Sequence, residues 1–113
     1  MDMSNILLSI IYFPLPLISL IIFTLFKFFP PSNISPWYGY RTKRSTSNSD
    51  NWQFAQKFSA NLGLTMSVIT LIIQIIVTIV VDNEQLKRNI VGVSWILGMV
   101  IIIYLTENKL KSR

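Results

Sequence analysis

The hydrophilic segment WYGYRTKRSTSN, residues 37–48, carries the side chains best suited to polar chemistry. Its cations, Arg41, Lys43 and Arg44, stand among threonine and serine hydroxyls. Guanidinium, ammonium and hydroxyl groups all donate hydrogen bonds, so this set suits phosphate oxygens, carboxylates or backbone carbonyls. The segment predicts either anchoring to lipid headgroups or a specific polar site. Nucleic-acid binding is disfavoured because the cations are few and adjoin long apolar stretches.

The composition leaves few groups for catalysis or metal binding. Histidine and cysteine are absent, which removes the commonest general base, the thiolate nucleophile and thiolate metal ligands. The acidic residues are not paired at a catalytic spacing, and Asp50 is better used as a helix cap. We therefore expect no catalytic residues, no metal and no cofactor. The five acids are Asp2, Asp50, Asp82, Glu84 and Glu107.

The overall composition is that of a membrane protein. Hydrophobic residues make up 51% of the 113 positions and charged residues only 13%, against roughly 25% charged residues in an average soluble domain. The formal net charge is +5. This charge would fit nucleic acid, anionic lipid or the determinants of membrane topology, and its distribution along the chain decides among them.

Three apolar stretches predict an all-α integral membrane domain, residues 1–113, with three transmembrane helices. They cover residues 6–29, 62–81 and 90–105. The first would be about 36 Å long as a helix, and a hydrocarbon core is roughly 30 Å thick. A cleaved signal peptide is the rival interpretation of this stretch, but Asp2 stands where basic residues are expected. The third stretch would reach only about 24 Å, so a re-entrant segment is its alternative.

The positions of Lys and Arg predict the orientation of the spans. Basic loops near span ends are retained in the cytoplasm. Eight cations fall in the central segment with its flanks and in the C-terminal tail, and Lys87 and Arg88 fall on the opposite side. We therefore expect a multi-pass cell-membrane protein with the N-terminus outside and the central segment and C-terminus in the cytoplasm. The eight are Lys27, Arg41, Lys43, Arg44, Lys57, Lys109, Lys111 and Arg113.

Two prolines interrupt the first predicted span. Pro14 and Pro16 cannot donate to the carbonyls of Ile10 and Tyr12, so we expect a kink or an opened turn there. In lipid those carbonyls need other partners, such as a nearby serine, a neighbouring helix or a water.

The second and third spans carry small and polar residues that predict helix–helix contacts. In the second span they recur every three or four positions, which places them on one stripe of a helix. Gln74, near the middle of the membrane, is the strongest pointer because a desolvated amide needs partners. Packing is favoured over a transport pathway, since no ionisable residue lies deep in any span. The predicted packing residues are Gly63, Ser67, Thr70, Gln74 and Thr78 in the second span, and Ser94 and Gly98 in the third.

The residues between the first two spans predict a loop followed by an interfacial amphipathic helix. Together they cover residues 30–61, with the loop running from Pro30 to Asn48. Asp50 is the expected N-cap, with Gln53 at the third helical position. Phe54, Ala55, Phe58 and Leu62 are expected on the apolar face, and Gln53, Gln56, Lys57 and Asn61 on the polar face.

The central segment resembles the signature of the SdpI family of small bacterial membrane proteins. The resemblance covers about residues 34–61. Its ordered signature residues start at Tyr38, and Ser35 departs from the asparagine expected at that position. The family is named for an immunity protein that protects its producer from a secreted toxic peptide. The matching residues, which the resemblance marks as a ligand site or as braces of the loop, are Gly39, Tyr40, Arg41, Thr42, Ser45, Asn48, Trp52 and Ala55.

The resemblance implies a fixed polar structure at the membrane surface, with Arg41 held by its neighbours and Trp52 packed beneath. It favours a nonenzymatic immunity or signalling protein that acts against a membrane-active toxic peptide and contacts the lipid bilayer. Such a protein would bind the peptide or shield its target, and could pass this state to a cytoplasmic regulatory protein. The alternative is a structural or accessory subunit that assembles with another membrane protein through the polar stripe of the second span. A homo-oligomer is also compatible with the pattern.

Overall fold

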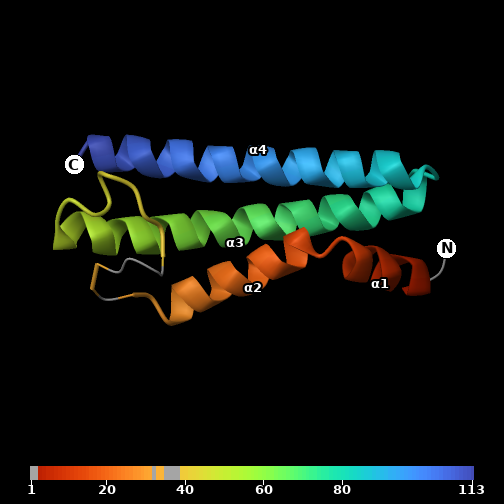
Figure 1. Cartoon of the computed structure of the whole chain (residues 1–113), viewed down its shortest axis with the longest axis horizontal. Helices are drawn as coiled ribbons and strands as arrows, with labels where there is room; N and C mark the ends of the chain where they lie inside the picture. The colour runs from red at the N-terminus through yellow and green to blue at the C-terminus, as the bar shows by residue number, and fades with distance from the viewer. Residues whose placement is uncertain (1–2, 32, 35–38) are drawn as a thin grey trace.

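The computed structural model of the chain is all-helical and describes residues 3–31, 33–34 and 39–113. Asp2, Ser35, Trp37 and Tyr38, which entered the sequence analysis, lie outside these residues. Two long helices form an antiparallel hairpin, and two shorter helices precede them (Figure 1). The helices are α1 (Met3–Tyr12), α2 (Leu15–Phe28), α3 (Ser49–Val80) and α4 (Glu84–Lys111).

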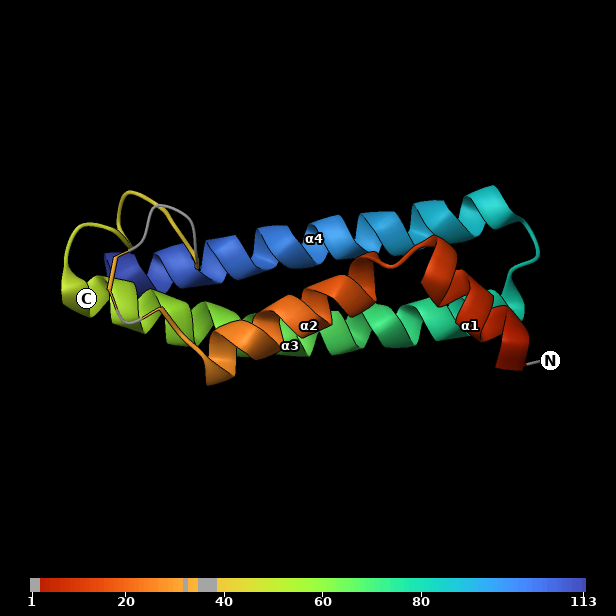
Figure 2. The same ribbon diagram turned by 60° about the horizontal axis from the view of Figure 1, so that its bottom comes forward.

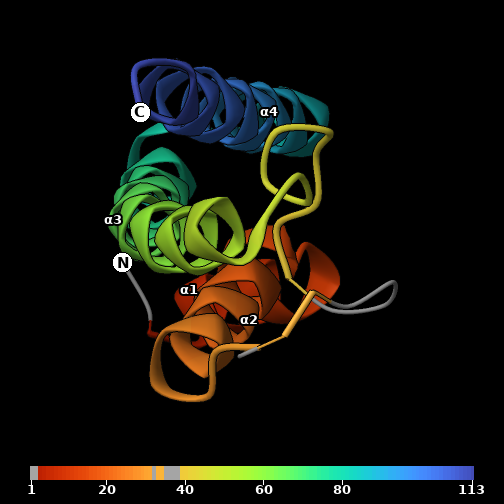
Figure 3. The same cartoon turned by 90° about the vertical axis from the view of Figure 1, so that its left-hand side faces the viewer.

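Helix α3 is the central element of the bundle. It packs against α4 on one side and against α2 on the other, as the view along the bundle axis shows (Figure 3). The molecule measures 50 × 24 × 19 Å, and 32 helical residues span about 48 Å, so the length of α3 sets the length of the bundle. Each of the other three helices packs against α3.

The predicted amphipathic helix and second span form one continuous helix, whose N-cap differs from the predicted residue. Helix α3 begins at Ser49, and its N-cap is Asn48, whose side chain accepts a hydrogen bond from the Asn51 backbone N–H. Asp50 therefore lies within the first turn, where its charge complements the helix dipole. An asparagine caps a helix as well as an aspartate does, so residue type alone did not separate the two.

The apolar and polar faces predicted for the start of α3 were also partly wrong. Gln56 is buried, with 2% of its surface exposed, whereas Phe54 and Phe58 are only partly covered and stack on each other. The buried face is set by the contact with α2 and the loop. It runs through Trp52, Ala55, Gln56, Ser59 and Ala60.

Helix α4 is longer than the predicted third span. It covers 28 residues, or about 42 Å, where the apolar run alone suggested residues 90–105. The side chain of Asn83 caps its start by accepting a hydrogen bond from the Leu86 backbone N–H. The helix continues through polar residues at both ends of the apolar run. Polar residues that flank a span can lie at the membrane surface.

The first predicted span is two helices rather than one. α1 and α2 meet at an angle of 71° across Phe13 and Pro14 (Figures 1 and 2). The prolines explain the break, since Pro14 and Pro16 remove two backbone donors within one turn. By length and composition α3 and α4 can each cross a membrane, and the bent pair α1–α2 would form a third span only if both halves count as one.

Gln74 of α3 supplies hydrogen bonds to the broken backbone. Its Nε2 donates to the carbonyl oxygen of Ser9 at 3.1 Å, to Ser9 Oγ at 3.3 Å and to the carbonyl oxygen of Phe13 at 3.0 Å. The amide is buried, with 2% of the residue surface exposed. The side chain of a neighbouring helix therefore bonds to the backbone on both sides of the carbonyls of Ile10 and Tyr12, the two that lose their donors to the prolines.

The polar stripe of α3 faces the first two helices of the same chain. Ser67 Oγ and Ser19 Oγ of α2 lie 3.0 Å apart and share a hydrogen bond. A Cβ at Gly63 would overlap the ring of Phe23, so glycine permits the close approach of α2. Thr70 and Thr78 instead donate to carbonyls of their own helix.

The two residues predicted as a contact pair in the third span differ in their surroundings. Gly98 of α4 is buried against α3, where a Cβ would lie 3.6 Å from the Cβ of Met66. Ser94 is partly exposed and donates to the Ile90 carbonyl of its own helix. Of the two, Gly98 therefore lies at the contact with α3, where a Cβ would still fit at an ordinary van der Waals distance.

Large apolar side chains remain exposed along all four helices. Ile11, Ile22, Ile72 and Ile101 are examples, each more than two fifths exposed. Apart from Trp52 and Val77, the buried positions in α3 are small or polar, as expected where helices pack against each other and present their apolar surface to lipid.

The central loop and the C-terminal end of α4 lie at one end of the bundle, and the start of α1 lies at the other (Figure 1). The predicted topology requires this arrangement, because it assigns the loop and the C-terminus to the same side of the membrane. Which end faces the cytoplasm stays a prediction from the positions of Lys and Arg.

We expect Gly63→Leu to separate α2 from α3, because its side chain would overlap the ring of Phe23. Overpacking of this kind lowers the free energy of unfolding by about 1–3 kcal/mol. The measurement is the temperature at which the detergent-solubilised protein loses its monodisperse elution profile. Gly92→Ala is the matched control, since its Cβ would meet Phe13 at an ordinary 3.6 Å. Equal thermal stability of both variants would contradict the packing role of Gly63.

Candidate functional site

The loop before α3 is held to that helix by a pair of hydrogen bonds from Gln56. The Tyr40 backbone N–H donates to Gln56 Oε1 at 2.6 Å, and Gln56 Nε2 donates to the Tyr40 carbonyl at 2.8 Å. The side-chain amide thus pairs with the backbone as a neighbouring strand would. Because Gln56 is buried, this pairing fixes the position of the signature loop relative to α3.

Gly39, the residue before the paired Tyr40, has a backbone conformation that favours glycine. Its φ is +99°, a conformation that residues with a side chain rarely adopt. A Cβ at this position would also overlap Gln56 Oε1 and approach Pro31 Cγ to 2.9 Å. Both the backbone conformation and the lack of space therefore require glycine.

Thr42 and Ser45 close a compact turn through reciprocal hydrogen bonds. The Thr42 N–H donates to Ser45 Oγ at 2.8 Å, and the Ser45 N–H donates to Thr42 Oγ1 at 3.2 Å. Ser45 Oγ also lies within hydrogen-bonding distance of the carbonyls of Tyr40 and Thr42. Ser45 is completely buried. Its hydroxyl thus replaces the backbone partners that a regular element would have provided.

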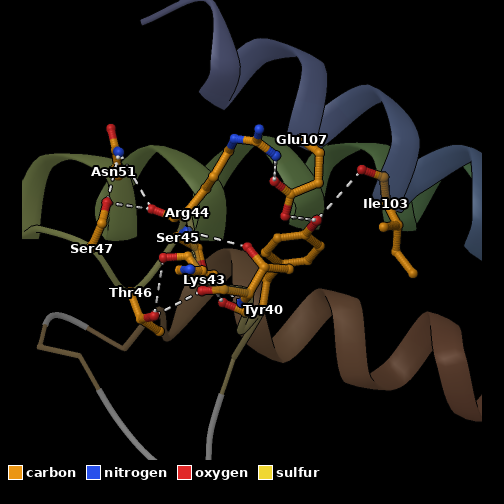
Figure 4. A network of polar contacts seen from close by, with 10 residues as sticks. Tyr40, Lys43, Arg44, Ser45, Thr46, Ser47, Asn51, Ile103 and Glu107 are labelled. Atoms are coloured by element: carbon orange, nitrogen blue, oxygen red, sulfur yellow. Dashed lines mark hydrogen bonds and ion pairs between the residues drawn. The ribbon is translucent and has the colours of Figure 1, made fainter.

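Asn48 and Asn51 join this turn to the start of α3. Asn48 accepts from the Asn51 N–H at 2.8 Å, and Asn51 Nδ2 donates to the Arg44 carbonyl and to Ser47 Oγ. The helix cap and the loop therefore share one hydrogen-bond network (Figure 4).

Trp52 and Ala55 lie on the buried face of α3 under the loop. Both are fully buried. Trp52 Nε1 donates to the Pro31 carbonyl at 2.8 Å, which fixes the chain as it leaves α2. This arrangement agrees with the expectation that Trp52 packs beneath the loop.

Glu107 connects the loop to α4. Tyr40 Oη donates to Glu107 Oε1 at 3.1 Å, and Arg44 Nη1 lies 3.6 Å from Glu107 Oε2 (Figure 4). Burial, and then the charge of Glu107 and the hydrogen bond to it, raise the pKa of the Tyr40 phenol well above its ordinary value. Tyr40 therefore remains a protonated donor throughout the physiological range. The Arg44 side chain is half exposed, so its ion pair adds little stability.

Arg41 and Lys43 are exposed, and neither side-chain charge forms an ion pair with a described residue. Arg41 is exposed, and within the described part of the chain it makes no hydrogen bond or ion pair, so the expected bracing of Arg41 by its neighbours is not seen. Beside it, a hollow of about 570 Å³ is lined by Thr42, Lys43, Arg44, Ser47 and Glu107. The exposed surface of the loop therefore offers cations and hydroxyls to an anionic group.

The structure brings the predicted signature residues together at one end of the bundle, but the residues that hold them there were missed. Gln56 and Glu107 bond to Tyr40, and Arg44 forms an ion pair with Glu107. Gln56 had a detectable signal, since it lies one turn from Trp52 and one from Ser59 and Ala60, on the face that continues to Gly63. Glu107 had none, because its contact spans 67 positions in the sequence.

The groups that this site offers are charges and hydrogen-bond donors and acceptors. Among the described residues, no group of three or more histidines, cysteines or acids could hold a metal ion. The loop instead presents fixed backbone groups and hydroxyls, with the two cations Lys43 and Arg44 beside the carboxylate of Glu107. Such a surface binds anionic groups such as phosphates or carboxylates.

Comparisons with known proteins agree with the signature. The model of the SdpI/YfhL protein family matches residues 32–106, about two thirds of the chain. The uncharacterized protein YfhL of Bacillus subtilis (strain 168) is 50% identical over 38 residues, a stretch that covers 34% of this chain and 34% of that relative. The aligned stretch thus spans about a third of the relative's length. No solved structure shows a significant match.

We expect Gln56→Leu to release the loop from α3, because the Tyr40 N–H would lose its acceptor and the Tyr40 carbonyl one of its donors. Each unsatisfied group of this kind costs about 1–3 kcal/mol. Limited trypsin digestion at Arg41, Lys43 and Arg44 measures the release. Gln53→Leu is the control, since Gln53 is exposed on the same helix. Similar cleavage rates in both variants would show that the glutamine pairing does not hold the loop.

We also expect Tyr40 to ionise at higher pH than an ordinary tyrosine. Since the folded-state pKa is raised, the stabilising Tyr40–Glu107 contact is fully present below the unfolded value of about 10. It is lost only as the pH rises through the higher folded-state value. Ultraviolet titration of the wild type minus Tyr40→Phe isolates this transition. Glu107→Gln should lower the pKa of Tyr40 only in part, because burial is the larger cause. A difference titration of the wild type whose midpoint lies at the pKa of an ordinary tyrosine would refute the contact.

Proposed function

The chain belongs to the SdpI/YfhL family, and from this premise we propose that it is a nonenzymatic membrane protein that protects the cell against a membrane-active toxic peptide. The observation that carries the proposal is the signature loop, a polar surface built on the end of a membrane-sized helical bundle. The loop is fixed by Gln56 and Glu107, and it leaves the Arg41 and Lys43 cations exposed.

The chemistry of the chain supports a binding role. With no histidine and no cysteine, catalysis would depend on the five acidic residues. Among these, Glu107 is occupied by Tyr40 and Arg44, and Glu84 is paired with Lys87. A protein that binds the peptide or shields its target needs only a shaped surface in the membrane, and this chain has one.

The loop also offers a surface for a cytoplasmic regulatory protein, in the predicted orientation with the loop inside. Arg41 and Lys43 are exposed, and the hollow beside them is open to an acidic group. Because Tyr40 and Arg44 connect the loop to α4, a shift of α4 caused by peptide would be transmitted to these cations. Protection and signalling would then use the same network.

The alternative function, assembly with another membrane protein through the polar stripe of α3, has less support. Gly63, Ser67 and Gln74 of that stripe contact α2 and α1 of the same chain. A partner subunit would therefore need a different surface, such as the exposed apolar face of α4.

The test of the proposed function is the sensitivity of cells to toxic peptides. We expect expression of the full chain in a sensitive bacterium to raise resistance to at least one peptide secreted by the same or a neighbouring strain. Arg41→Ala should lower that resistance by about tenfold, the factor for one lost hydrogen bond to a charged group. Its abundance in the membrane should stay unchanged, because Arg41 has no partner within the described chain.

Lys57→Ala is the matched control, since Lys57 is exposed on α3 outside the loop. Membrane abundance is measured by immunoblotting for every variant in the same cells. Unchanged sensitivity to every peptide tested, with the protein present in the membrane, would reject the immunity role. Lost Arg41→Ala protein would instead make Arg41 a structural brace.

A further inference from the structure

A cavity of about 380 Å³ lies at the end of the bundle opposite the loop. It is enclosed by α1, by the last turns of α3 and by the first turns of α4. Figures 1 and 2 show that α1 turns away from the line of α2 beyond the break. None of the ten residues of α1, all of them described, is buried. The cavity thus follows from the 71° bend at the prolines.

The walls of this cavity combine apolar, polar and charged side chains. Leu8, Phe13, Val77 and Val91 contribute apolar surface, and Gln74 lies at the level of the break. The first two turns of α4 place Glu84, Lys87 and Arg88 at the outer end. A ligand that fits this profile is amphiphilic, with its charged group at the outer end.

The surplus charge at the outer end is positive. Lys87 Nζ lies 3.0 Å from Glu84 Oε1, so these two charges compensate each other. Arg88 is exposed and makes no ion pair within the described residues. Its guanidinium is therefore available to a carboxylate, which it can bind through two parallel hydrogen bonds.

Deeper in the cavity the protein offers hydrogen-bond acceptors. Gln74 Oε1 is buried and accepts no hydrogen bond from any described group. Tyr12 also lines the cavity, and its carbonyl lacks the donor that an unbroken helix would supply, because residue 16 is a proline. Such acceptors require an N–H or O–H group from the ligand.

These features distinguish a peptide from a membrane lipid. Below the phosphate of a diacyl phospholipid lie ester carbonyls and hydrocarbon, which cannot donate hydrogen bonds. A peptide end carries a carboxylate and, within a few ångströms of it, backbone N–H donors and side chains. The order of groups in the cavity, an outer cation, apolar walls and inner acceptors, therefore matches a peptide end.

We propose that this cavity binds the C-terminal carboxylate end of an apolar peptide, with Arg88 as the carboxylate partner. The inference rests on the proposed protection against a membrane-active peptide and gives that peptide a place to bind. The bound peptide would bridge α1 and α4, and α4 also carries Glu107 at the other end of the bundle. Occupancy of the cavity and the state of the loop are thereby linked through one helix.

The binding test uses the full chain in nanodiscs of phosphatidylcholine. The probes are a fluorescent synthetic peptide of alternating leucine and serine with a free C-terminal carboxylate, and the same peptide as its C-terminal amide. Fluorescence anisotropy should give a Kd about tenfold lower for the free acid, as expected for one hydrogen bond to a charged group. Arg88→Gln should abolish that preference. Lys109→Gln, which removes an exposed cation from the opposite end of α4, should preserve it.

A second pair of variants tests the location. Leu8→Trp places a large ring at a partly exposed position in the cavity wall and should weaken binding of both peptides. Leu7→Trp, at an exposed neighbouring position outside the lining, should have no effect. Equal affinity for acid and amide, or a preference that survives Arg88→Gln, would overturn the proposal. Loss of peptide binding when phosphatidylglycerol is added would assign the site to an anionic lipid instead.

Failure of this site and failure of the immunity role give different results. Resistant cells combined with equal binding of acid and amide would leave the protective role and reject the cavity. An Arg88-dependent preference for the acid, in a chain that gives no resistance to any peptide, would leave the cavity and reject the protective role.

Discussion

Irregular backbone inside a membrane needs hydrogen-bond partners from the protein itself, and α3 supplies such partners at two places. Gln74 bonds to the carbonyls of Ser9 and Phe13 where proline breaks the first span. Gln56, on the same side of the helix five turns earlier, pairs with the backbone of Tyr40 in the loop. The rest of the architecture follows, because both irregular segments are placed by amides on one straight helix.

These two glutamines hold the irregular segments of the chain, Gln56 at the loop and Gln74 at the proline break. At one end the signature loop is a fixed set of cations and hydroxyls, connected to α4 through Tyr40, Arg44 and Glu107. At the other end the broken span leaves a cavity below Arg88. α4 runs past both ends as a continuous helix of 28 residues. One helix therefore connects the loop with the cavity that we propose as a peptide site.

Membership of the SdpI/YfhL family agrees with this division of the chain. The matched residues 32–106 contain the loop, α3 and most of α4, and they leave α1 and α2 outside. The matched part thus holds the fixed loop and its anchors. The unmatched part holds the proline break, which shapes the cavity.

The sequence by itself determined the all-helical membrane character, the positions of the apolar helices and the residues of the loop. Apolar runs, prolines and the turn at Gly39 act locally, so their consequences can be derived from neighbouring residues. The stripe from Gly63 to Gln74 was also derivable, because a 3.6-residue period places it on one face. Only the tertiary structure decided that Asn48 rather than Asp50 caps α3 and that Gln56 is buried. It alone brought Glu107 to Tyr40, and it left Arg41 exposed. Each of these depends on which surface meets which across the bundle, and such contacts between distant residues leave no periodic trace in a single sequence.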